Sequence, residues 1–396
     1  MIQISAETQL FIHDHQMDDV RTLALQAQKY PHIDMPTAIT QIAGRQVAAE
    51  KIPSWKEIDE IWYPKHLSLE QCSSEITARY KAKLIEGNSL ADLTGGFGID
   101  CSFLATKFSS VTYVERQKEL CELAAHNFPI LKLNHIHIAN QDGVDYLQQM
   151  SPVDCIFIDP ARRNEHGGKT VAISDCEPDV ASLEDVLLNK AKRVMIKLSP
   201  MLDLSLALNE LQYVEEIHVI SANNECKELL LILGQTLINE PPIHCINLNT
   251  KKPQKDQCFI FTHTAEQQSE CTYTKTLENY LYEPNASLLK AGAFRSIASK
   301  YKVKKLHANS HLYTSENLVS DFPGRAFRII NQCSLNKKEL KEKLFGVDKA
   351  NITVRNFPAS VAELRKRIRL AEGGETYLFA TTLYNEQKVL IRCEKI

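Results

Sequence analysis

The sequence predicts an α/β fold in which a mainly parallel sheet is covered by helices on both faces. Between residues 89 and 234, short apolar runs alternate with segments of helical periodicity, the pattern of parallel strands joined by crossover helices. The last two apolar runs, 216–220 and 229–233, are separated only by the polar stretch Ala222-Asn223-Asn224-Glu225. Because no helix fits there, the closing pair of strands should be antiparallel.

The residues before this region should be helical. Pro36 stands where a first helical turn tolerates proline, and apolar residues follow it at helical spacing, at Ile39, Ile42, Ala43 and Val47. A further helix through 73–83 leads into the first strand. We therefore expect a helical N-terminal domain over residues 1–85.

The central domain is expected over residues 86–235. Besides the closing pair, its strands are predicted at 90–93, 111–114, 136–139, 155–158 and 194–198. Helices should fill the intervals, at 99–107, 118–127, 144–149, 180–190 and 204–211.

Weaker signals follow Gly234. Strands are predicted at 258–262 and 280–283, and a helix at 286–299. From Arg325 onward the pattern is strand, helix, strand, helix, strand, strand. We expect a small α+β domain at 236–324 and another at 325–396.

The composition excludes several classes of protein. The chain has 396 residues, of which 44% are hydrophobic and 24% charged, so it is neither collagen-like nor disordered. No run approaches the ~18 apolar residues of a membrane helix, and the start carries no secretory signal. The 11 cysteines form no CxxC pair, and the HxH pairs of histidines lack companion ligands. We expect a reduced, cytoplasmic protein with no metal site and no membrane association.

The net charge of −3 hides an asymmetry. Residues 325–396 carry 15 Lys and Arg against 8 Asp and Glu, so the rest of the chain is acidic. A basic end on an acidic body is typical of nucleic-acid binding, although a solvated charged helix gives the same pattern.

A glycine-rich stretch at the end of the first strand is the strongest motif: Asp92-Leu93-Thr94-Gly95-Gly96-Phe97-Gly98. Small residues let the backbone approach a ligand, and the following helix start offers free N–H groups. The dinucleotide fingerprint GxGxxG is not met, because Cys101 stands at its third glycine. Asp92 suits a ligand with an ammonium group, and a tight strand-to-helix turn is the alternative.

Polar residues also follow the second and third strands. Glu115 can accept hydrogen bonds from both hydroxyls of a ribose, and Gln141-Asp142-Gly143 can recognise an adenine amino group. Each could instead cap a helix. Because ligands bind beyond the carboxyl ends of parallel strands, polar residues at successive strand ends favour one shared site.

The fourth strand is followed by Asp159-Pro160-Ala161-Arg162-Arg163. Asp159, with carbonyl groups freed by Pro160, can hold an amino or imino hydrogen of an acceptor and direct the acceptor's lone pair at an electrophile. Arg162 and Arg163 suit contacts with phosphate, and ion pairs with nearby acidic residues are the alternative.

Taken together, residues 86–234 resemble a class I S-adenosylmethionine-dependent methyltransferase, whose Rossmann-like sheet has seven strands with an antiparallel last strand. The resemblance implies S-adenosyl-L-methionine as the cofactor. It assigns the methionine part to Asp92 and the loop residues through Gly98, the ribose to Glu115, and the adenine to Asp142 with Gly143. Asp159 and Pro160 would orient the acceptor nitrogen.

The segment before the first strand, Ser73-Ser74-Glu75-Ile76-Thr77-Ala78, is similar to the cofactor-covering helix of the trimethylguanosine-synthase group. That similarity implies that Gln71 and Ser73 contact the cofactor.

Two departures from related families bear on the acceptor. Amino-methylating families carry a second proline and an aromatic residue where this chain has Ala161 and Arg162, which disfavours a cap guanine. The Asp-Pro-Ala-Arg stretch is similar to that of the uridine C5-methyltransferases, but the place of their nucleophilic cysteine reads Lys197-Leu198-Ser199-Pro200. A covalent pyrimidine mechanism is therefore disfavoured. Lys197 is a candidate contact for phosphate or cofactor, or else a solvated lysine.

Two further stretches, Tyr282-Glu283-Pro284-Asn285-Ala286-Ser287 and Phe322-Pro323-Gly324-Arg325, extend the resemblance to the whole chain. They resemble a bacterial group of methyltransferases with a ferredoxin-like insert and a C-terminal THUMP-like domain. The resemblance implies a ferredoxin-like domain within 236–324, a THUMP-like domain at 325–396, and an RNA partner such as tRNA or rRNA.

The sequence therefore predicts a methyltransferase that modifies an amino or ring nitrogen of an RNA base, without a covalent intermediate. Two alternatives stand beside it. One is an RNA-binding protein that keeps the fold without turnover, and the other is a methyltransferase for a small-molecule or protein acceptor.

Overall fold

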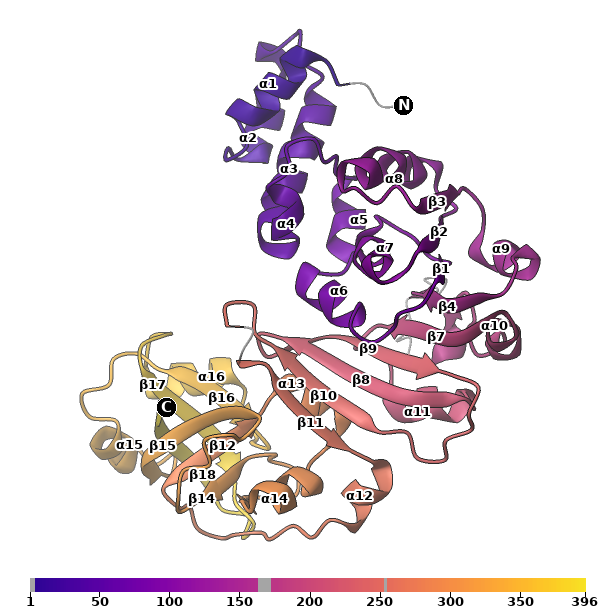
Figure 1. The fold of residues 1–396 in the computed structure, drawn as a ribbon. Coiled ribbons are helices and arrows are strands. Elements are labelled where there is room, and N and C mark those ends of the chain that lie inside the picture. The colour runs from indigo at the N-terminus through magenta and orange to yellow at the C-terminus, as the bar shows by residue number, and fades with distance from the viewer. Residues whose placement is uncertain (1–3, 163–171, 253–254) are drawn as a thin grey trace. The chain divides into compact units, whose positions relative to one another are not determined.

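The computed structural model describes residues 4–162, 172–252 and 255–396 (Figure 1). The chain divides into two compact units, Met1–Glu216 with Glu228–Ile238, and Ile217–Lys227 with Asn239–Ile396. Each unit has hydrophobic clusters of its own.

The first unit begins with helices, as predicted. They are α1 (Ala6–Asp14), α2 (Val20–Leu25), η1 (Ala27–Lys29), α3 (Met35–Lys51), α4 (Pro53–Lys56), α5 (His66–Gln71) and α6 (Glu75–Lys81). Ser5, Asp19 and Asp34 cap α1, α2 and α3, each accepting a hydrogen bond from the backbone N–H three residues on. Pro36 lies in the first turn of α3, where its missing N–H costs nothing.

The predicted parallel sheet is present. Its strands are β1 (Ser89–Asp92), β2 (Ser110–Val114), β3 (Ile136–Ala139), β4 (Val153–Ile158), β7 (Ala191–Leu198), β8 (Val214–Ala222), β9 (Glu225–Leu233), β10 (Ile243–Leu248) and β11 (Gln257–Phe261). Their order in the sheet is β11-β10-β8-β9-β7-β4-β1-β2-β3. β1, β2, β3, β4 and β7 are parallel, whereas β9 runs antiparallel to β7, which confirms the predicted antiparallel closing strand.

This sheet extends beyond the predicted seven strands. β10 pairs parallel with β8, and β11 pairs antiparallel with β10. β10 was not predicted from the sequence, for two reasons. Pro241 and Pro242, directly before it, indicate a turn, and its apolar run is short.

The helices of the first unit follow the strands as expected. They are α7 (Ile99–Leu104), η2 (Ala105–Lys107), α8 (Lys118–Ile130), α9 (Gly143–Gln149), α10 (Glu184–Lys190) and α11 (Leu204–Glu210). A short pair of strands, β5 (Ala161–Arg162) and β6 (Cys176–Glu177), stands beside η3 (Ile173–Asp175). The helix predicted to begin at residue 180 begins only at Glu184. Asp179 accepts a hydrogen bond from the backbone N–H of Ser182, and this local bond favours a turn there.

The second unit contains a seven-stranded sheet with the order β13-β14-β12-β15-β18-β17-β16. Its elements after β11 are α12 (His263–Gln268), β12 (Tyr280–Pro284), α13 (Ala286–Ala291), α14 (Arg295–Tyr301), β13 (Lys304–Lys305), β14 (Tyr313–Ser315), β15 (Gly324–Cys333), α15 (Lys337–Lys343), β16 (Asn351–Arg355), α16 (Val361–Ile368), β17 (Thr376–Thr382) and β18 (Lys388–Lys395). The predicted order after Arg325 is therefore correct. The helix expected at 286–299 is instead split, because Gly292 has a left-handed φ of 79° that ends α13.

Two clusters of buried side chains fill the second unit. One joins Leu281 of β12 to Phe327 of β15 and Phe379 of β17. The other packs α15 and α16 against the sheet through Leu340 and Leu364. β12 and β15 are antiparallel neighbours, so the sheet is continuous between them. Among the described residues, no helix has the length and apolar character needed to cross a membrane.

Candidate functional site

A cavity of about 560 Å³ lies in the first unit at the carboxyl ends of the parallel strands. It is lined by most of the residues proposed from the sequence, namely Gln71, Ser73, Asp92, Thr94, Gly95, Gly96, Phe97, Gly98, Glu115, Asp142, Gly143, Asp159 and Lys197. Pro160, which follows Asp159 in the chain, is buried. Arg163 lies outside the described residues. Arg162 is described only through its backbone, which pairs with Cys176 in β5–β6.

The glycine-rich loop between β1 and α7 needs its glycines for two different reasons. Gly96 and Gly98 have φ angles of 55° and 85°, a left-handed conformation that L side chains rarely adopt. Gly95 leaves room for its neighbour, because a Cβ there would overlap the ring of Tyr113. The glycines are therefore needed for the backbone conformation of the loop and for its close packing against Tyr113.

The carboxylate of Glu115, directly after β2, is hydrogen-bonded to this loop. One carboxylate oxygen accepts the backbone N–H of Gly96 at 2.9 Å, and the other accepts the N–H of Gln117 at 2.7 Å. A carboxylate has about four lone-pair sites, so these two bonds leave it able to accept ligand hydroxyls. Glu115 thus shapes the loop and presents negative charge to the cavity.

Asp92 ends β1 in a buried position. Its carboxyl accepts the N–H of Thr94 at 3.0 Å. Burial raises the pKa of Asp92 well above its ordinary value, and the Thr94 N–H opposes that rise only in part. A cation placed in the cavity would favour the ionised form of this carboxyl.

Asp142 has the helix-capping role that the sequence left open as an alternative. One of its oxygens accepts the N–H groups of Val144 and Asp145 at 2.8 and 3.3 Å, at the start of α9. Asp142 also lines the cavity, so capping holds its carboxylate in place there. Gly143 is needed beside it, because a Cβ would overlap the carbonyl oxygen of Leu93.

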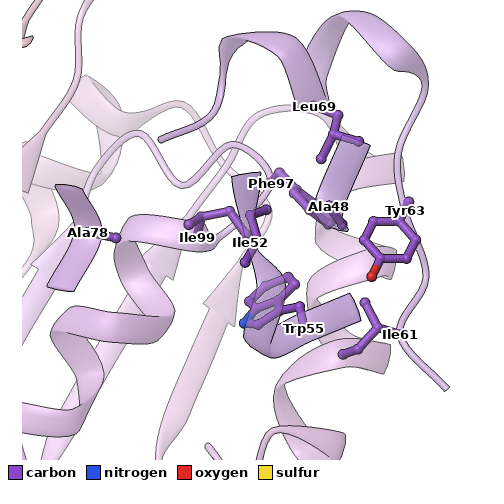
Figure 2. Close-up of a cluster of buried hydrophobic side chains, with 9 residues drawn as sticks. All are labelled: Ala48, Ile52, Trp55, Ile61, Tyr63, Leu69, Ala78, Phe97 and Ile99. Atoms are coloured by element: carbon purple, nitrogen blue, oxygen red, sulfur yellow. The ribbon is translucent and has the colours of Figure 1, made fainter. Parts of the chain in front are cut away.

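The N-terminal helices are packed onto the glycine-rich loop. Figure 2 shows the apolar cluster that joins them: Ala48, Ile52, Trp55, Ile61, Tyr63, Leu69, Ala78, Phe97 and Ile99. Phe97 of the loop meets Trp55 edge-on, with ring centroids 5.3 Å apart. This packing places Gln71 at the end of α5, and Ser73 before α6, on the wall of the cavity.

Thr94 links the glycine-rich loop to the loop after β4. Its hydroxyl oxygen accepts the backbone N–H of Asp159 at 2.7 Å. The sequence marked Thr94 only as a departure from the commonest glycine, and the contact explains why a hydroxyl stands there. This hydrogen bond therefore holds the two loops together at the wall of the cavity.

Replacing Thr94 with valine should lower the free energy of unfolding by about 1–3 kcal/mol, because the Asp159 N–H would lose its acceptor at a part-buried position. Chemical denaturation measures this change. Thr106→Val, an exposed threonine in η2, is the matched control and should stay within about 0.5 kcal/mol of the unchanged protein. Equal stability of the two variants would show that the Thr94 hydroxyl does not contribute to the free energy of unfolding.

Lys197 lies at the end of β7 against the loop after β4. Its ammonium is 2.5 Å from an Asp159 oxygen and 3.2 Å from an Asp100 oxygen. Burial alone would lower the pKa of Lys197, but Asp159, Asp100 and Glu228 raise it well above its ordinary value. Lys197 is therefore a charged group buried among carboxylates.

Sequence reasoning missed the groups behind Lys197. Lys81 of α6 lies 3.0 Å from Asp100 and 2.6 Å from Glu228 of β9. Burial alone would raise the pKa of Asp100, but the two lysines lower it to about 2. The available signal was a charged residue next to an apolar run, since Glu228 precedes the buried run Leu229–Leu233.

Two family models match the second unit of the chain. One describes a ferredoxin-like domain and matches residues 280–323. The other is described as THUMP domain-like and matches residues 324–395.

Known proteins resemble the chain to different extents. A crystal structure of a protein from Porphyromonas gingivalis W83, designated a methyltransferase, is 37% identical, with 100% of both chains covered and a TM-score of 0.87. An uncharacterised RNA methyltransferase of Mycoplasma mobile is 36% identical over 76 residues, which are 19% of this chain. The match spans about a fifth of that relative (21%).

Proposed function

The chain belongs to the family of methyltransferases represented by the Porphyromonas gingivalis protein, and on that basis we propose that it transfers a methyl group from S-adenosylmethionine to a nitrogen of an RNA base. The observation that carries the proposal is the single cavity around which a glycine-rich loop and four acidic residues, Asp92, Glu115, Asp142 and Asp159, converge.

The cavity suits S-adenosylmethionine in size, backbone and charge. Its volume of about 560 Å³ falls within the range of ordinary small-molecule sites. Glu115 stands at the end of the second strand, where a carboxylate can bind ribose hydroxyls in folds of this kind. When bound, the cofactor would supply a methyl group on a positively charged sulfur, which is an electrophile.

The chain's own residues would bind and orient both partners. Asp92 and the loop backbone at Gly95 and Gly96 would hold the methionine part of the cofactor, Glu115 the ribose and Asp142 the adenine. Gln71 and Ser73 would cover it.

The acceptor would be held at Asp159. Its carboxylate, with the carbonyl of Pro160, would accept hydrogen bonds from the N–H groups of an amino or ring nitrogen and direct the nitrogen lone pair at the methyl group. Such positioning supplies most of the acceleration when the electrophile is already reactive. Arg162 and Arg163 stay proposed contacts for phosphate.

An RNA acceptor is supported from the second unit. The region 324–395 is THUMP domain-like, and the Mycoplasma mobile relative is named an RNA methyltransferase. α15 and α16 cover the same cluster of buried side chains, and the side chain of Arg367 reaches the carbonyl of Leu335 just before α15. These helices and their ends expose Lys337, Lys338, Lys341, Lys366, Arg367 and Arg369, which we call the basic surface. Glu339, Glu342 and Glu363 of the same helices are also exposed.

RNA affinity should fall steeply with salt, because each phosphate contact releases bound counterions. Exchanging Lys338, Lys366 and Arg367 together for glutamine should make the slope of log K against log[salt] shallower by about 2. Filter binding between about 50 and 300 mM salt measures the slope. The control exchanges three exposed lysines of the first unit, Lys83, Lys107 and Lys118, and should leave it unchanged. An unchanged slope in the first variant would exclude this basic surface as the phosphate contact.

The proposed function is tested by transfer of a labelled methyl group from S-adenosylmethionine. Acceptors are RNA from cells lacking the gene, separated into tRNA and rRNA, with DNA and protein in parallel reactions. Glu115→Gln removes one of the two backbone hydrogen bonds and should weaken cofactor binding by about tenfold or more. Asp185→Asn, an exposed residue of α10, is the charge-matched control.

Label entering one RNA fraction, and falling with Glu115→Gln at limiting cofactor, is the expected outcome. Label entering only protein or a small molecule would reject RNA as the acceptor. Cofactor binding without transfer to any acceptor would favour a binding protein that keeps the fold.

A further inference from the structure

Five charged side chains form a continuous row that begins on the cavity wall, in the order Asp159, Lys197, Asp100, Lys81 and Glu228. This ionic row alternates in sign, and each neighbouring pair lies within 3.2 Å. Its members come from five places in the first unit: the loop after β4, β7, α7, α6 and β9.

The exposure of the side chains to solvent decreases from Asp159 to Lys81. The side chain of Asp159 is 34% exposed, whereas that of Lys197 is 11% exposed and that of Lys81 is fully buried. Burying charges costs several kcal/mol per ion unless partners compensate. Asp159, Lys197 and Asp100 line the cavity, and Asp159 is the most exposed of the three, so the combined effect of the row acts on the carboxylate that a ligand can reach most easily.

Ser73 joins the two lysines within the row. Its hydroxyl oxygen accepts a hydrogen bond from each ammonium, at 3.0 Å from Lys81 and 3.1 Å from Lys197, and its hydrogen is donated to Asp100 at 2.7 Å. A hydroxyl has one donor and two acceptor sites, so all three are used.

The donors of Lys197 are equally accounted for. An ammonium has three N–H donors, and Lys197 has three oxygen partners, on Asp159, Ser73 and Asp100. A lysine with this set of partners has no donor to spare for a phosphate. The geometry favours a role inside the protein over a contact with substrate.

We propose that Lys197 is a positioning residue for Asp159, holding one carboxylate oxygen so that the group stays ionised and presents its other oxygen to the acceptor. The acceptor part of this inference rests on the proposed function, whereas the hold of Lys197 on Asp159 is a property of the chain alone. Asp100 and Lys81 act behind Lys197 by fixing its place.

The electrostatic setting gives the sign of the expected change. Burial raises the pKa of Asp159, and Lys197 works against that rise more than any other group. The other charges facing Asp159 are Asp100 and Asp92, which favour its neutral form, and Lys81, which favours its ionised form. Without Lys197 the carboxyl would therefore protonate at higher pH.

The test compares Lys197→Met with Lys192→Met, an exposed lysine at the start of the same strand. The first readout is the titration of Asp159 by carboxyl ¹³C NMR in the protein without cofactor, with the signal assigned through Asp159→Asn. The pH of half-protonation should rise by about 1 or more in Lys197→Met and stay unchanged in Lys192→Met.

The second readout is the pH profile of methyl transfer. Its acid limb should move to higher pH in Lys197→Met, with kcat reduced by about tenfold or more and the Kd for S-adenosylmethionine changed by less than about threefold. Lys197→Arg, which keeps the charge, should recover part of the rate.

An unshifted Asp159 titration in folded Lys197→Met would overturn the inference. Should that variant not fold, Lys197→Gln, which keeps a donor without the charge, is read in the same way. If the unchanged protein transfers no methyl group, the proposed function fails, while the NMR titration still decides whether Lys197 holds Asp159.

Discussion

Replacing Asp159 with asparagine should reduce the rate of methyl transfer by about 10²–10⁴-fold. The variant keeps the size of the side chain but removes its charge. A neutral carboxamide holds an acceptor hydrogen less strongly than a carboxylate does, because hydrogen bonds to ionised groups are about twice as strong. Its one oxygen can accept from Lys197, but the NH2 group then stands where the second carboxylate oxygen would accept from the acceptor.

Cofactor binding should hardly change in the same variant, because the residues proposed to bind the cofactor are elsewhere on the cavity wall. Single-turnover transfer with saturating partners measures the chemical step, and equilibrium dialysis measures cofactor binding. Asp185→Asn, with the same loss of charge at an exposed position, is the control. An Asp159→Asn protein that keeps more than about a tenth of the rate would mean that another group holds the acceptor.

Replacing Lys81 with methionine should lower the free energy of unfolding by about 3–5 kcal/mol. Lys81 is fully buried, and its ammonium lies between the carboxylates of Asp100 and Glu228. Removing it leaves two buried carboxylates of like charge, with Lys197 as the remaining cation of the ionic row. Methionine fills a similar volume, so the loss measured by chemical denaturation would come from charge and hydrogen bonding.

Two further variants separate charge from packing at Lys81. Lys83→Met, two residues on and exposed, should change the free energy of unfolding by less than about 0.5 kcal/mol. The double variant Lys81→Met, Glu228→Gln should regain part of the lost stability, since it removes one of the uncompensated carboxylates. If the single Lys81→Met variant is as stable as the original protein, Asp100 and Glu228 can become protonated without lowering the free energy of unfolding.

Local patterns were sufficient to predict the framework of the site. Alternating strands and helices identified the parallel sheet, and parallel strands bring their carboxyl ends to one edge. Asp92, Glu115, Asp142 and Asp159 each follow or end such a strand, and all four line one cavity. The resemblance to methyltransferases with ferredoxin-like and THUMP-like regions is likewise confirmed.

Contacts between distant residues could not be predicted in this way. Lys81 and Glu228 are 147 residues apart, and Thr94 and Asp159 are 65 apart. A sequence pattern reports the face on which a side chain lies, but not which side chain from another element meets it. Lys197 is the clearest example: its position at a strand end was evident, whereas its three oxygen partners come from three other parts of the chain.

The continuous sheet that joins β12 to β15 also determines where the second unit can be divided without breaking its sheet. The boundary between residues 323 and 324 divides two matched regions but falls within one sheet. Ending the chain there would strip β12 of a neighbour and open its edge to pairing with other molecules. We therefore expect the two regions to occur together in related proteins. A truncated protein lacking residues 325–396 should aggregate, so its failure to bind RNA would not show that these residues recognise RNA.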